Sequence, residues 1–203
     1  RRDIERRIIR TIGDPELRFG EDHLRMLRAI RFAATLGFTI EAETFAAIRE
    51  RAAAIGRVSA ERIREEMTGV LTGGGARRGL ELLADSGLLA EILPEVLALK
   101  GVSQPPRFHP EGDVWEHTLR MLALLPLCEG RADARLAWAV LRFALEVRWA
   151  WAPVIVSRRR AIRRWFLSRK IWSAAWRLAF ASAIPGWRNF ITTSFAPIPR
   201  LSN

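Results

Sequence analysis

The chain has 203 residues, of which 49% are hydrophobic, and it carries a formal net charge of +11. This length suits one or two small domains with a buried core. The single cysteine, Cys128, excludes an internal disulfide framework. No uninterrupted apolar run reaches the roughly 18 residues of a membrane-spanning helix. A soluble, cytoplasmic protein without a membrane partner is therefore expected.

The excess positive charge is confined to the C-terminal third of the chain. Residues 1–135 contain 21 basic and 21 acidic side chains, whereas residues 136–203 contain 12 basic side chains and one acidic one. Most of the tryptophans, from Trp138 to Trp187, lie in the same segment. The total charge therefore does not support a nucleic-acid partner for the chain as a whole, because its two parts differ in composition.

The N-terminal residues predict a series of short helices. Residues 1–10 place isoleucines at a spacing of four between charged residues, which suggests a short amphipathic helix. Asp14-Pro15 predicts a helix N-cap followed by proline at the first helical position. Two later helices are expected within residues 41–56 and 59–71, with Ser59 as the N-cap of the second.

The longest of these helices is predicted to begin at Glu21 and to end before Gly37, with Glu21 and Asp22 in its first turn. One face carries charges of both signs, including Arg25 and Arg28. Apolar residues recur on the other face at steps of three and four; they are Met26, Leu27, Ile30, Ala33 and Ala34.

The glycine run 73–75 is the clearest break, and it predicts a boundary between a neck domain at residues 1–73 and the start of a helical body at residues 74–141. No alternation of apolar and polar residues is long enough to predict a strand. The expected fold class is therefore all-α, an irregular array of helices in neck and body. Residues 142–203 form an Arg/Trp-rich tail that predicts no packed fold.

A carboxylate and a guanidinium at the spacing of Asp22 and Arg25 could read a nucleobase. Asp22 could accept from the exocyclic amino group of cytosine or adenine, while Arg25 donates to the neighbouring ring nitrogen. Uracil and guanine present a ring N–H at that position and would be rejected. The alternative interpretation is a solvated face of ion pairs, each contributing only tenths of a kcal/mol.

Residues 13–33, which read GDPELRFGEDHLRMLRAIRFA, closely resemble the neck of class II CCA-adding tRNA nucleotidyltransferases and bacterial poly(A) polymerases. The resemblance continues through residues 36–41, 59–66 and 78–83. It implies that Asp22 and Arg25 bind the base of ATP or CTP, with Glu21 in a supporting role. Further supporting positions are Arg28, Arg62 and Glu66; the last two could equally form an i, i+4 pair.

The same resemblance implies template-independent nucleotide addition to the 3′ end of RNA, with tRNA as a partner. The two Mg²⁺ ions of such chemistry bind paired carboxylates on a strand. The 203 residues of this sequence contain no Asp-x-Asp pair of that kind. We therefore expect a fragment that is inactive alone. The alternative is a stand-alone, non-catalytic helical domain that binds RNA or serves as a scaffold.

Residues 108–118 resemble the opening of an HD phosphohydrolase-like body, in which His117 would be a first metal ligand. Arg142-Phe143 stands where the His-Asp pair that completes such a site is expected. We therefore expect no metal site here, and we expect His109 in a loop and His117 on a helix surface.

The tail from residue 142 to residue 203 has two interpretations. A shift of reading frame near residues 140–142 would explain the sudden loss of acidic residues. The functional alternative is a cationic Trp-Arg segment that binds RNA backbone or an anionic membrane surface.

Overall fold

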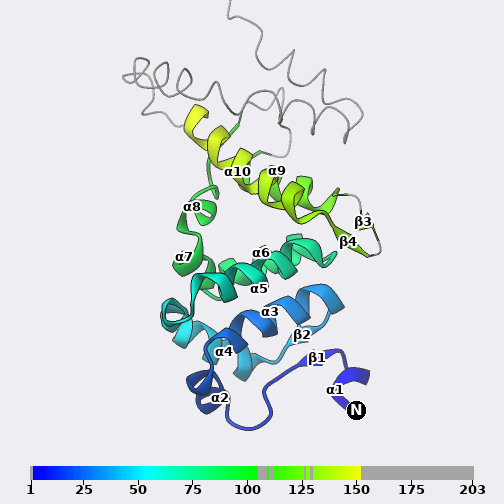
Figure 1. Cartoon of the computed structure of the whole chain (residues 1–203), viewed down its shortest axis with the longest axis vertical. Helices are drawn as coiled ribbons and strands as arrows, with labels where there is room; N and C mark the ends of the chain where they lie inside the picture. Colours follow the sequence, from blue (N-terminus) through cyan, green and yellow to red (C-terminus); the bar gives the residue numbers. More distant parts are fainter. Residues whose placement is uncertain (1, 105–108, 110–111, 126, 129, 152–203) are drawn as a thin grey trace, which may run out of the picture. The chain divides into compact units, whose positions relative to one another are not determined.

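The computed structural model describes residues 2–104, 109, 112–125, 127–128 and 130–151 (Figure 1). All of the described residues belong to one compact unit. Both interpretations of the tail concern residues that lie almost entirely outside the described part. The boundary predicted at residue 73 stays a prediction.

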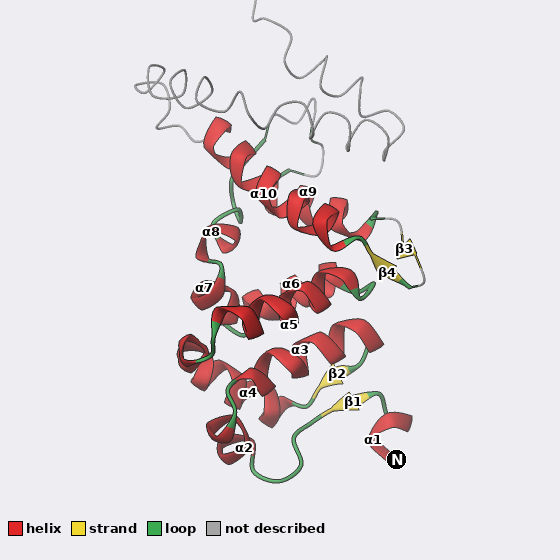
Figure 2. Ribbon diagram, in the orientation of Figure 1, coloured by secondary structure: helices red, strands yellow, loops and turns green. Residues whose placement is uncertain are grey.

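Helices dominate the described residues, so the predicted all-α class is confirmed (Figures 1 and 2). The last helix, α10, crosses residue 141 and continues the predicted body into the first ten residues of the predicted tail. The helices are α1 (Arg2–Glu5), α2 (Pro15–Glu21), α3 (Leu24–Leu36), α4 (Ala42–Arg51), the 3-10 helix η1 (Ala52–Arg57), α5 (Ala60–Thr72), α6 (Ala76–Asp85), α7 (Leu88–Ile92), α8 (Pro94–Leu97), α9 (Val114–Ala123) and α10 (Ala134–Trp151).

Two short strand pairs accompany the helices (Figure 2). The parallel pair is formed by β1 (Ile8–Ile9) and β2 (Thr39–Ile40), and the antiparallel pair by β3 (Leu127–Cys128) and β4 (Arg131–Ala132). The prediction of a helix across residues 1–10 is therefore wrong beyond Glu5. The β-branched residues of β1 favour an extended backbone. The amide of Glu41 donates to the carbonyl of Ile9 at 2.9 Å and so holds β1 beside β2.

Helix α3 provides the centre of the neck core. The five residues of its predicted apolar face are all buried, which confirms that face. Gly37 ends the helix in the left-handed conformation with φ of 66°, which a residue without Cβ adopts at low cost. Asp14 caps α2 as predicted, because its carboxylate accepts from the amide of Glu16 at 2.8 Å.

The helices pack in a chain of neighbours. Helix α3 lies against α5 and α6, α6 against α9, and α9 against α10 (Figure 1). Arg77 on α6 bonds both carboxylate oxygens of Glu116 on α9, and the indole N–H of Trp138 on α10 donates to the hydroxyl of Thr68 on α5 at 3.0 Å. None of the helices described is both long and apolar enough to cross a bilayer.

The two histidines of the body lie against each other, His117 on α9 and His109 in the segment before it. His109 lies outside the helices and strands, as predicted for a loop residue, and it is only 7% exposed. Its ring meets the half-buried ring of His117 edge-on, with centroids 4.9 Å apart.

Candidate nucleobase-binding site

The predicted helix over residues 21–36 is interrupted at Asp22. Helix α2 ends at Glu21, Asp22 is extended with φ of −149°, and α3 begins at Leu24. Glu21 and Asp22 are therefore not in the first turn of α3, contrary to prediction. The Asp22 side chain explains the break, because its Oδ1 accepts from the amide of Leu24 at 3.1 Å and so competes with a continuous helix.

The second oxygen of Asp22 contacts another helix. Oδ2 accepts a hydrogen bond of 3.1 Å from Nη2 of Arg62 on α5, and the carboxylate is about three-quarters buried. Burial is the largest influence on the pKa of Asp22 and raises it. The Leu24 amide and the Arg62 guanidinium together outweigh that influence, so the pKa of Asp22 lies below its ordinary value. Asp22 is therefore a fixed, ionised acceptor.

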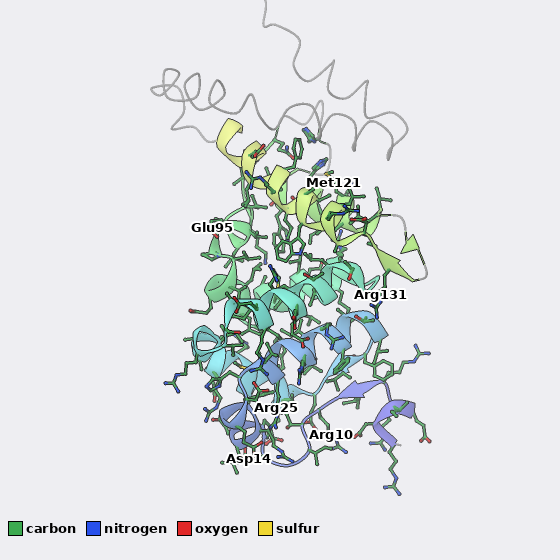
Figure 3. All side chains as sticks on the ribbon, in the orientation of Figure 1. Arg10, Asp14, Arg25, Glu95, Met121 and Arg131 are labelled. Carbon is green, nitrogen blue, oxygen red and sulfur yellow. The ribbon has the colours of Figure 1, made fainter. Side chains whose placement is uncertain are left out.

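Arg25 lies in the first turn of α3, beside α2 (Figure 3). Its Nη1 donates to the carbonyl of Arg18 at 2.9 Å and also bonds the carboxylate of Glu21. Arg25 and then Arg18 lower the pKa of Glu21 by these hydrogen bonds. Glu21 thus anchors Arg25 on α2, and its supporting role in base binding stays a prediction.

Glu66 on α5 holds two arginines of α3. Its carboxylate, with a side chain only 10% exposed, accepts from Nε of Arg28 at 2.9 Å and from Nε of Arg31 at 2.7 Å. Arg62 bonds Asp22 instead of pairing with Glu66 along its own helix. Arg31 was missing from the predicted site residues; the signal that could have found it is its spacing of three from Arg28 on one helix.

These contacts leave hydrogen-bonding capacity at the junction of α2 and α3. We call Glu21, Asp22, Arg25 and Arg62 the junction site. An ionised carboxylate has about four acceptor positions, and Asp22 uses two of them. Among the described residues, Arg25 uses only Nη1 as a donor, so Nε and Nη2 can still donate. The junction site therefore presents an acceptor and a donor whose positions are fixed before any ligand binds.

Comparison with known proteins identifies the family of the chain. A family model described as a probable RNA and SrmB-binding site of polymerase A matches residues 37–99. A multifunctional CCA protein of Thioalkalivibrio sulfidiphilus is 41% identical over 147 residues, which cover 70% of this chain and 34% of that protein. The chain belongs to the CCA-adding enzyme and poly(A) polymerase family.

A solved structure of this family has a similar fold. The crystal structure of the Bacillus stearothermophilus CCA-adding enzyme in complex with CTP matches with a TM-score of 0.53 and 35% sequence identity. The match covers 79% of this chain and 38% of that one. The chain thus spans about a third of the length of the relatives it matches.

The described residues do not fit a metal ion. They contain no group of three or more His, Cys, Asp or Glu side chains placed to hold one. Asp22 and Glu66 are each bonded to arginine, which neutralises the charge that Mg²⁺ would need. The Mg²⁺ that the family resemblance implies therefore has no ligand set in this part of the chain.

Proposed function

We propose that this chain is the base-reading and RNA-binding part of a template-independent nucleotidyltransferase that adds CMP and AMP residues, or AMP alone, to RNA 3′ ends in the cytoplasm. The observation that carries the proposal is the junction site, where Asp22 is held ionised by Arg62 and the Leu24 amide, and Arg25, three residues further along the chain, is anchored to the carbonyl of Arg18. Mg²⁺ would serve the complete enzyme through residues other than those described, and no step proposed here involves it.

Base selection would follow from the fixed polarity of the two groups. Asp22 can only accept, since Arg62 and the Leu24 amide keep it ionised, and it suits the exocyclic amino group of cytosine or adenine. Arg25 can only donate, so it suits the unprotonated ring nitrogen next to that amino group. Uracil and guanine would leave a donor facing Arg25, which costs the desolvation of an unpaired polar group.

A nucleotide titration of the full chain tests this proposal. We expect ATP and CTP to bind more tightly than UTP and GTP, and Asp22→Asn to abolish the preference because the amide can donate as well as accept. Asp85→Asn is the matched control, since Asp85 is exposed at the end of α6. Binding of RNA without any binding of ATP or CTP would contradict the proposal and favour a non-catalytic RNA-binding domain.

A further inference from the structure

Phe32 on α3 is the only aromatic residue among the exposed large hydrophobic side chains of the described part, with 43% of its surface accessible. It lies on the helix that carries Arg25. Seven residues separate the two, which is nearly two turns, so both project from the same face. At 1.5 Å per residue they are about 10 Å apart along the helix. The ring of Phe32 therefore lies on the same face of α3 as Arg25, about 10 Å from it along the helix axis.

The ring of Phe32 is covered by a fixed cation on one side. The guanidinium carbon of Arg31 lies 4.4 Å from the ring centroid. Arg31 in turn donates to Glu66 at 2.7 Å, so its position is set by a nearly buried carboxylate. A guanidinium over an aromatic face is attractive because of the ring quadrupole. Phe32 is thus oriented by its neighbours before a ligand arrives.

Gly69 on α5 leaves the space that this arrangement needs. A Cβ at position 69 would lie 2.4 Å from Cδ of Arg31, which is closer than real atoms approach. The side chain of Arg31 crosses α5 at this point on its way to Glu66. Residues from two helices therefore cooperate to place the cation beside Phe32.

We propose that Phe32 is a stacking platform for an unpaired base near the 3′ end of the RNA. Aromatic rings bind unpaired bases of any sequence by stacking, while nearby cations attract the backbone phosphates. Arg28 lies on α3 between Arg25 and Phe32, and half of its side chain is accessible for such a phosphate. Stacked nucleotides advance by about 3.4 Å, so about three of them span the distance from Phe32 to Arg25.

This inference rests on the proposed function for the role of the RNA end, but the platform itself can be tested with RNA alone. The probes are a short single-stranded oligoadenylate and a blunt RNA duplex of the same length, each titrated against the full chain by fluorescence anisotropy. We expect Phe32→Leu to weaken single-strand binding about tenfold and to leave duplex binding unchanged. Phe32→Trp should bind the single strand at least as tightly as the natural chain.

Leu36→Ala is the matched control, because Leu36 is exposed one turn further along the same helix face. Its single-strand affinity should equal that of the natural chain. Unchanged single-strand affinity in Phe32→Leu would overturn the platform. An equal loss for strand and duplex would also overturn it, since stacking requires unpaired bases.

The nucleotide titration separates the two proposals. If Phe32→Leu loses single-strand affinity while ATP and CTP bind as in the natural chain, both proposals stand. If the natural chain binds no nucleotide but Phe32→Leu still loses single-strand affinity, the proposed function fails and the platform stands. A loss of RNA affinity restricted to Asp22→Asn would overturn the platform and leave the base-reading role.

Discussion

Two charged networks of this protein differ in how fully their groups are used. Between α6 and α9, Arg77 donates to both oxygens of Glu116 and to Glu81, while Arg120 adds a further bond to Glu116. We call these four residues the α6–α9 bridge. Its central guanidinium uses Nε, Nη1 and Nη2, whereas at the junction site Arg25 uses a single nitrogen.

This difference is the one expected between a structural network and the proposed binding site. The α6–α9 bridge has little capacity left for a ligand, and its bidentate geometry suits the joining of two helices. The junction site keeps acceptor positions on Asp22 and donors on Arg25 available. The number of ion pairs alone would not distinguish the two, because both consist of arginines and carboxylates. What distinguishes them is the capacity that remains.

The largest stability effect is expected at Glu66, where one nearly buried carboxylate serves two arginines. Glu66→Gln should lower the free energy of unfolding by about 2 kcal/mol, because the guanidiniums of Arg28 and Arg31 lose their counter-charge. Urea denaturation measures this change. Glu65→Gln is the control, since the neighbouring Glu65 is exposed. Equal midpoints for the two variants would contradict a structural role for Glu66.

A smaller effect is expected at the α6–α9 bridge. Arg77→Met keeps the aliphatic stem but removes the bidentate bond to Glu116, so it should lower the free energy of unfolding by about 1 kcal/mol. Nucleotide and RNA affinity should not change. Arg64→Met on the exposed side of α5 serves as the reference for loss of one positive charge. Weaker nucleotide binding by Arg77→Met would contradict the purely structural role of the α6–α9 bridge.

The corresponding change at the junction site should have the opposite pattern. Arg25→Met removes bonds to the exposed Glu21 and to the carbonyl of Arg18, and we expect no measurable change in the denaturation midpoint. The preference for ATP and CTP over UTP and GTP should disappear, as measured by competition titration. A clear loss of stability with intact discrimination would make Arg25 a structural residue.

The smallest effect is expected from pH. The pKa of Asp22 is lowered from its ordinary value of 3.8 in the folded protein, so the unfolded chain binds more protons below that pH. The contribution of Asp22 to stability is therefore complete above about pH 4 and is lost as the pH falls through the lowered pKa. Asp22→Asn should flatten the dependence of the denaturation midpoint on pH in this range. Asp85→Asn should leave it unaltered.

The helical fold and the core face of α3 could be predicted because the signals are local. Met26, Leu27 and Ile30 are spaced by the helical period, and burial of such a face needs no information about its partner. The pairing of β1 with β2 could not be predicted, because two-residue strands carry no periodic pattern and their contact joins segments thirty residues apart.

The residues of the candidate site could be named from the sequence, but their connections could not. Asp22 suits the first turn of a helix and equally suits a cap, and only the packing of α3 on α5, with the bond from Arg62, decides between them. Arg62 has Glu66 within reach along its own helix, yet it bonds Asp22 across helices. Which carboxylate an arginine bonds depends on how the helices pack, and residue spacing along one helix gives no information about that packing. The roles of Asp22 and Arg25 in base reading remain predictions.

Gly69 is a position where a substitution that favours the helix would disturb a contact between helices. Glycine inside a helix costs about 1 kcal/mol relative to alanine, so a search for more stable variants would select Gly69→Ala in α5. That substitution would place a methyl group on the path of Arg31 toward Glu66. Gly69 thus lowers the intrinsic helix propensity of α5 but leaves room for the side chain of Arg31 from α3. A substitution that makes α5 more helical at this residue would displace the guanidinium that covers the ring of Phe32.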